Sequence, residues 1–128
     1  MASTTGFVAY HRGWNELRAE DLGFLWEHFV LNELMAQLQT RRVQYWRDKA
    51  GHEVDFVLGK RRQEVAAIEC KWSAEGFDPG NLRSFRGRYP KGPSYVVSQD
   101  VKRPYVREWS GVKVEFVGLR DLVARITG

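Results

Sequence analysis

The sequence contains only one cysteine, Cys70, which excludes an intramolecular disulfide and a zinc site built from several cysteines. No apolar run approaches the ~18–20 residues that a membrane-spanning helix needs. The phosphate-binding pattern GxxxxGK[ST] is also missing, so no nucleotide is expected to bind by that route. Residues 1–12 are small and polar and lack the apolar core of a secretory signal, which favours a cytoplasmic location.

The size and composition are those of one folded domain. The chain has 128 residues, of which 43% are hydrophobic and 28% are charged, so it is too apolar to be disordered. Residues 1–18 are rich in small polar residues and show no periodicity, and they are expected to be a tail or linker. Residues 19–128 are expected to form the domain.

The charge is positive and unevenly distributed. Lys and Arg exceed Asp and Glu by four, and the segment from Arg83 to Arg107 has seven cations and a single acid. A basic segment of this kind is typical of a nucleic-acid partner, although an ordinary solvated surface explains it about as well. The residues expected to contact nucleic acid are Arg83, Arg86, Arg88, Lys91, Arg103 and Arg107.

Periodicity predicts a mixed α/β sheet flanked by helices. A helix is expected from Asp21, as its N-cap, to Thr40, with Glu27 on its apolar face. A hairpin, a third strand and a β–α–β crossover then follow in the order αβββαββα. The later elements are expected as strands over 43–49, 52–58 and 64–72, a helix over 81–89, strands over 94–98 and 112–117, and a helix over 119–126.

Alternation places charged residues together on the strand expected over 52–58. Glu53 and Asp55 are two residues apart and should share one face. Val54, Phe56 and Leu58 should share the other face and point into the core.

The strand expected over 64–72 carries a second charged pair. Glu69 and Lys71 share a face with Val65 and Ala67, so the two charges belong to an otherwise apolar strand. A buried acid needs a partner, and an adjacent salt bridge is the simplest one.

A divalent metal offers a further reason for these charges. Mg²⁺ or Mn²⁺ takes one or two carboxylates plus water and phosphate, and Asp55 and Glu69 on neighbouring strands could supply them. Glu27 could complete such a site from the helix. Lys71 would then act on the attacking water or on the phosphate during phosphodiester cleavage.

The order Glu27, Glu53-Val54-Asp55, Glu69-Cys70-Lys71 resembles the PD-(D/E)XK nuclease superfamily, and especially archaeal Holliday-junction resolvases. Three longer segments, within 23–34, 45–58 and 68–73, resemble an uncharacterised nuclease-like domain at the C-terminus of prokaryotic AAA-type ATPases. Val54 replaces the proline of the motif, and the ATPase part is absent from this chain.

The resemblance implies a restriction-endonuclease-like fold and a metal-dependent nuclease, with DNA as the expected substrate. Glu27, Asp55, Glu69 and Lys71 would be its catalytic residues, and the first three would hold Mg²⁺ or Mn²⁺. An AAA-type ATPase module and a second copy of the chain are the protein partners it suggests. The alternatives are a non-catalytic module that binds nucleic acid or protein within an ATPase system, and an effector or toxin nuclease.

Simpler interpretations stay open for several of these residues. Glu27 could pair with Arg47, and Glu53 could be an ordinary ion-pair partner. His28 is more typical of a surface or satisfied helix histidine than of a catalytic one. The expected role of Trp26, Trp46 and Trp72 is in the core or a cleft wall rather than in base stacking.

Overall fold

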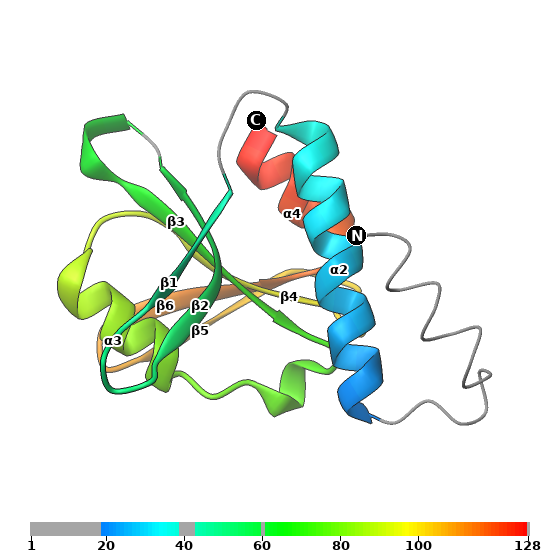
Figure 1. The fold of residues 1–128 in the computed structure, drawn as a ribbon, viewed down its shortest axis with the longest axis horizontal. Helices are drawn as coiled ribbons and strands as arrows, with labels where there is room; N and C mark the ends of the chain where they lie inside the picture. The colour runs from blue at the N-terminus through cyan, green and yellow to red at the C-terminus, as the bar shows by residue number, and fades with distance from the viewer. Residues whose placement is uncertain (1–18, 39–42, 60, 128) are drawn as a thin grey trace.

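The computed structural model describes residues 19–38, 43–59 and 61–127. The expected tail, residues 1–18, lies outside them, as do Thr40 and Lys60. The elements follow the chain in the order drawn in Figure 1. They are α2 (Ala19–Gln37), β1 (Gln44–Arg47), β2 (Glu53–Gly59), η2 (Arg61–Gln63), β3 (Val65–Lys71), η3 (Ala74–Gly76), α3 (Gly80–Arg88), β4 (Ser94–Ser98), β5 (Tyr105–Trp109), β6 (Val112–Val117) and α4 (Leu119–Thr127).

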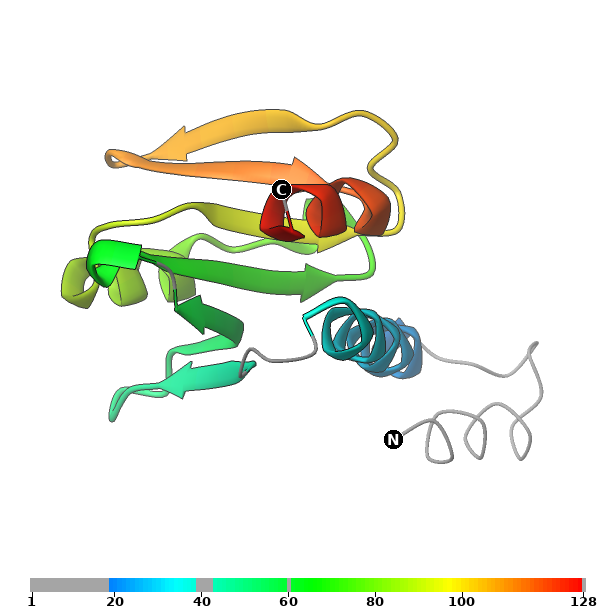
Figure 2. The same ribbon diagram turned by 90° about the horizontal axis from the view of Figure 1, so that it is seen from above.

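The six strands form one mixed sheet in the order β1-β2-β3-β4-β6-β5. β1, β2 and β3 are antiparallel, β3, β4 and β6 are parallel, and β5 returns antiparallel to β6. Figure 2 shows β5 and β1 at opposite edges of the sheet. The expected α/β fold with a mixed, helix-flanked sheet is therefore confirmed.

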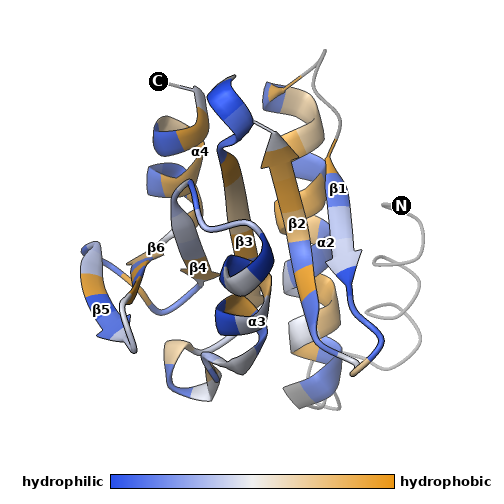
Figure 3. Cartoon of the chain, turned by 90° about the vertical axis from the view of Figure 1, so that its left-hand side faces the viewer, coloured by the Kyte–Doolittle hydropathy of each residue, from blue (hydrophilic) through white to orange (hydrophobic). Residues whose placement is uncertain are grey.

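Helices cover both faces of the sheet. α2 and α4 lie on one face over a core that includes Leu34, Ile68 and Leu122. α3 lies on the other face, where Leu82 and Phe85 pack into a second core. Figure 3 looks at this second face and shows α3 over the middle strands, with β5 uncovered at the edge.

The hairpin between β1 and β2 forms where turn chemistry favours it. The Gly51 backbone N–H donates to the Asp48 carbonyl oxygen at 3.2 Å, and Gly51 has a φ of +92°. Glycine adopts this left-handed conformation without a steric penalty, so the chain can reverse there. This confirms the predicted hairpin.

Three local predictions are corrected by the structure. β5 is an additional strand, which the order αβββαββα omitted. Asp21 lies in the first turn of α2, which already includes Ala19, so it is not the N-cap. Val54 is buried in the core under α3, whereas Phe56 is buried in the core under α2 and α4, so the two do not share a face.

A β-bulge explains the change of face along β2. Gln44 pairs with Val57 but Trp46 pairs with Val54, so two residues of β2 lie opposite Tyr45 alone. The extra residue at Asp55–Phe56 interrupts the strict alternation of side chains. A bulge changes the direction in which nearby side chains point. The side chain affected here is that of Asp55, one of the candidate acids.

Candidate functional site

β2 and β3 separate at the position of the candidate acids. Their Cα pairing extends from Gly59↔Val65 to Phe56↔Ile68. Beyond it, the Asp55 backbone N–H donates to Glu69 Oε1 at 3.3 Å, and the Cys70 N–H donates to Asp55 Oδ2 at 2.8 Å. Two carboxylates thus occupy the space where the backbone ladder would continue, and we call this position the carboxylate gap.

The two carboxyl groups of the gap are held in an unfavourable environment for negative charge. Glu69 is only 3% exposed. Burial, and then the nearby Asp55 charge, raise the pKa of Glu69 from 4.5 to about 7. Burial also raises the pKa of Asp55, while the Lys71 charge opposes the rise at both residues. A cation here would relieve the repulsion between the two acids.

Lys71 belongs to the same site. It is the last residue of β3, it is partly buried, and its positive charge acts on Asp55, Glu69 and Glu27. The Ser98 hydroxyl donates to the Lys71 carbonyl oxygen at 2.6 Å, which ties the end of β3 to the end of β4. The structure therefore brings Asp55, Glu69 and Lys71 together.

Glu27 approaches the gap from α2. It is partly buried, and burial followed by the Asp55 charge raises the pKa of its carboxyl group. The expected alternative partner, Arg47, instead donates to Glu53 Oε1 through Nε at 2.9 Å. Glu53 thus behaves as an ordinary exposed ion-pair partner, and Glu27 lies within electrostatic range of Asp55.

Asn81 is a member of the site that the sequence did not reveal. It lies at the start of α3, accepts the Glu53 backbone N–H at Oδ1 at 3.2 Å, and hydrogen bonds with the Glu69 side chain. A signal existed in the turn Asp78-Pro79-Gly80, which positions the first turn of a helix. Asn81 therefore links α3 to both strands of the gap.

The donor set fits a hard divalent cation only in part. Asp55 and Glu69 supply two close carboxylates, which is as many as Mg²⁺ usually takes from a protein. Within residues 19–38, 43–59 and 61–127, no group of three or more His, Cys, Asp and Glu side chains is arranged to hold a metal ion. Glu27 is close enough to these two carboxylates for the Asp55 charge to raise its pKa, and its role as a third ligand stays a prediction.

The expected nucleic-acid contacts divide into exposed residues and one buried residue. Arg83, Arg88, Lys91, Arg103 and Arg107 are all exposed. Arg86 is only 7% exposed, and burial lowers its pKa to about 10. Its guanidinium donates to Ser94 Oγ and to the carbonyl oxygens of Val65, Tyr89, Lys91 and Pro93.

Arg86 is therefore corrected from a phosphate contact to a structural residue. Its donors are used inside the protein, where they join the end of α3 to the starts of β3 and β4. Within the exposed set, Arg103 lies in the connection between β5 and β4, whose last residue pairs with Lys71, whereas Arg88 and Lys91 lie at the opposite end of α3 from Asn81.

The tryptophans and His28 take the simpler roles. The Trp26 Nε1–H donates to the Val97 carbonyl oxygen at 3.0 Å, and its ring meets Trp72 edge to face at 6.2 Å. The Trp46 ring packs edge to face against Phe85. The Nδ1 atom of His28 lies 3.2 Å from the Phe24 carbonyl oxygen of the same helix.

Comparison with known proteins gives a family. Residues 22–115 match the family described as "Domain of unknown function (DUF4143)", and the chain belongs to this family. No curated protein matches the chain. No helix among the described residues is long and apolar enough to cross a membrane.

Solved structures also match the chain, and the example described here is similar at low identity. It is described as a refined half-complex from a tetradecameric assembly of Thermococcus gammatolerans McrB AAA+ hexamers with bound McrC. The identity is 14% and the TM-score is 0.49. The match covers 75% of this chain but only 27% of that chain, so the chain spans about a quarter of its length.

Proposed function

We propose that this domain is a divalent-metal-dependent nuclease that hydrolyses phosphodiester bonds in DNA. The observation that carries the proposal is the carboxylate gap. Asp55 and Glu69 lie side by side between diverging strands, with Lys71 at the end of the same strand as Glu69. Two desolvated acids and a lysine serve no evident packing purpose there, and a cation with a bound phosphate would complement all three.

Each residue has a distinct role in the proposed chemistry. Asp55 and Glu69 would hold Mg²⁺ or Mn²⁺, and the bound ion would supply Lewis-acid stabilisation of the phosphate charge. Lys71 would orient the attacking water or donate hydrogen bonds to the scissile phosphate. Glu27 would add negative charge next to Asp55, and Asn81 would hold the Glu69 carboxylate in place. The exposed arginines would bind the backbone, which contributes affinity but little sequence preference.

Metal dependence tests the proposal. We expect plasmid, linear duplex, single-stranded or branched DNA to be cut in Mg²⁺ or Mn²⁺, and cutting to stop in excess EDTA. A panel of these four substrates with RNA beside them, resolved on denaturing gels, measures it. Cleavage that persists in EDTA would exclude the metal mechanism, and no cleavage of any substrate with either metal would exclude the nuclease.

The second candidate is a non-catalytic module that binds nucleic acid and works with an AAA-type ATPase. It is supported by the exposed cations Arg83, Arg103 and Arg107, which can bind phosphates without a metal ion. It is compatible with the AAA+ hexamers named for the similar solved structure. Calorimetric titration with Mn²⁺ separates the two, because the nuclease should bind the ion and lose it on Asp55→Asn, whereas a module without a metal site should not respond.

A further inference from the structure

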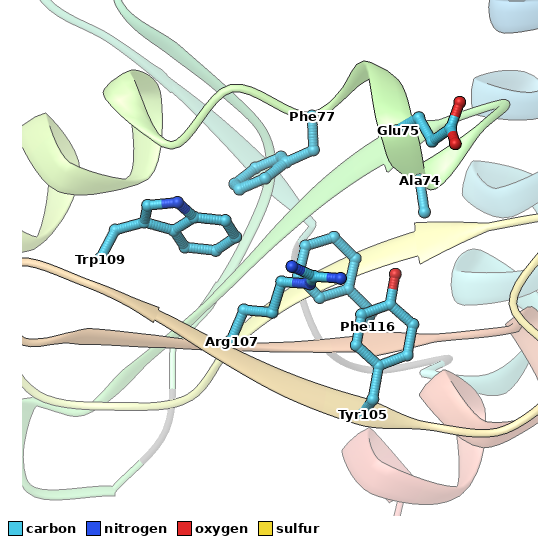
Figure 4. A pocket seen from close by; sticks show the side chains of 7 residues that line it. All are labelled: Ala74, Glu75, Phe77, Tyr105, Arg107, Trp109 and Phe116. Atoms are coloured by element: carbon cyan, nitrogen blue, oxygen red, sulfur yellow. The ribbon is translucent and has the colours of Figure 1, made fainter.

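A pocket on the α3 face is not used by the proposed chemistry. It has a volume of about 280 Å³ and lies between β5, β6 and the turn η3, as Figure 4 shows. The ring of Tyr105 stacks flat on Phe116, with centroids 4.8 Å apart and planes 4° from parallel. Phe77 meets Phe116 edge to face at 5.5 Å and lies 5.4 Å from Trp109. The walls of the pocket are therefore mainly aromatic rings.

A charged side chain is held among these rings. Tyr105, Arg107 and Trp109 alternate along β5, so their side chains share one face. The Arg107 guanidinium carbon lies 5.5 Å from the Tyr105 centroid, and Figure 4 shows the group directed into the pocket. Tyr105 is 38% exposed, so one end of this aromatic wall is accessible from solvent.

The register of the sheet joins the pocket to the carboxylate gap. Glu69 pairs with Val96, Val96 pairs with Phe116, and Phe116 pairs with Tyr105. Two strand spacings place Glu69 and Phe116 about 10 Å apart at their backbones. Val96 and Phe116 pack under α3, and Glu69 hydrogen bonds with Asn81 of α3. The side chains of Glu69, Val96 and Phe116 therefore lie on the same face of the sheet, the face that α3 covers.

The pocket wall is also fixed to the end of β3. η3 begins three residues after Lys71, and Asp100 accepts both the Ser73 hydroxyl and the Ala74 N–H at 3.1 Å. The distance from the pocket to Glu69 and Lys71 is thus fixed by strand pairing on one side and by the hydrogen bonds to Asp100 on the other.

We infer that this pocket receives one unstacked base of a single-stranded nucleic acid, or of an unpaired stretch, whose neighbouring phosphate lies at the carboxylate gap. The placement of the phosphate rests on the proposed function. Flat aromatic walls accept any base by stacking, and an arginine donor can recognise an acceptor on the base edge. Glu75 lines the same pocket, where a carboxylate repels a phosphate but can accept a hydrogen bond from an exocyclic amine.

The inference is tested by the affinity of the full chain for short labelled single strands and matched duplexes, measured by fluorescence anisotropy in EDTA. Tyr105→Ala should weaken single-strand binding about 5- to 100-fold, because base stacking is lost. Tyr105→Phe keeps the ring and should restore most of the affinity. Arg107→Gln should weaken binding more than Arg103→Gln, which removes the same charge outside the pocket. Thermal melting checks that each variant is folded.

A photo-cross-linking experiment locates the base. A single strand that contains 5-iodouracil should cross-link to the peptide holding Tyr105 and Trp109. Unchanged affinity in Tyr105→Ala, or cross-links confined to other peptides, would overturn the inference while leaving metal-dependent cleavage intact. Loss of single-strand binding in Tyr105→Ala, in a protein that cuts nothing, would uphold the pocket and reject the nuclease.

Discussion

At Glu69, burial and the Asp55 charge disfavour the ionised carboxyl group in the folded protein. Its pKa is about 7 in the fold, against 4.5 as the usual value. Between these two values the folded state holds more protons than the unfolded state, so the free energy of unfolding should fall as pH rises from about 4.5 to about 7. The loss is on the order of 2–3 kcal/mol if no cation is bound.

The measurement for Glu69 is urea unfolding of the metal-free protein in EDTA across this pH range. Glu69→Gln, which cannot ionise, should flatten the pH dependence relative to wild type, and Glu108→Gln on the exposed edge strand is the matched control. Mn²⁺ should restore stability to wild type at pH 7 but not to Glu69→Gln. A wild-type curve parallel to that of Glu69→Gln would show that Glu69 has an ordinary pKa.

At the scale of single elements, Arg86 decides how α3 joins the sheet. Replacing it with methionine would remove the donor to Ser94 Oγ and to four carbonyl oxygens, of which those of Lys91 and Pro93 also accept a backbone N–H, from Val65 and Ala67. We expect Arg86→Met to cost at least about 2 kcal/mol, since an unsatisfied buried polar group costs about 1–3 kcal/mol. Arg88→Met, on the exposed side of the same helix, should stay within about 0.5 kcal/mol of wild type.

Chemical unfolding of the two variants measures this difference. Equal stabilities would mean that the guanidinium network contributes nothing. The comparison also separates a structural arginine from a phosphate-binding one, because Arg86 and Arg88 have the same charge and lie two residues apart.

The elements differ in how well their sequences specify them. β4 was predicted at its observed bounds because Ser94–Ser98 is apolar and bounded by turn residues, and it is buried throughout. β5 was missed because four of its five residues are exposed and its core contacts come from rings that stack only in three dimensions. Edge strands depend on pairing with a neighbour, which local sequence does not show.

The residues of the candidate site also differ in how well the local sequence predicts their positions. The acid-x-Lys spacing was sufficient to bring Glu69 and Lys71 to one end of β3. The direction in which the Asp55 side chain points depends on a β-bulge. This bulge arises from the register between β1 and β2 and has no signature in the local sequence. Asn81 reaches the site only because α3 packs across the sheet, and the burial of Arg86 depends on the same packing.

At the scale of the whole molecule, the exposed cations on and beside the α3 face should control nucleic-acid binding. The logarithm of the binding constant should fall linearly with the logarithm of salt concentration, because each neutralised phosphate releases counterions. The triple variant Arg83→Gln, Arg103→Gln and Arg107→Gln should flatten that slope by about 2–3.

A triple variant elsewhere on the surface provides the control for this slope. Lys49→Gln, Lys113→Gln and Arg120→Gln remove the same net charge from other exposed positions. Titrations in increasing KCl should give this control a slope close to wild type. Equal slopes for the two triple variants would place the nucleic-acid contact away from the α3 face.

The most direct test of the nuclease account is a comparison of Asp55→Asn and Lys71→Ala in metal binding and cleavage. The carboxylate holds the ion, so Asp55→Asn should lose both Mn²⁺ binding in calorimetry and cleavage. An ammonium cannot ligate a cation, so Lys71→Ala should keep Mn²⁺ binding while its cleavage rate falls by about 10²-fold or more. Lys113→Ala, an exposed lysine on β6, should retain both. Cleavage by Lys71→Ala within about twofold of wild type would contradict the account, because a catalytic role of this kind is worth far more in rate.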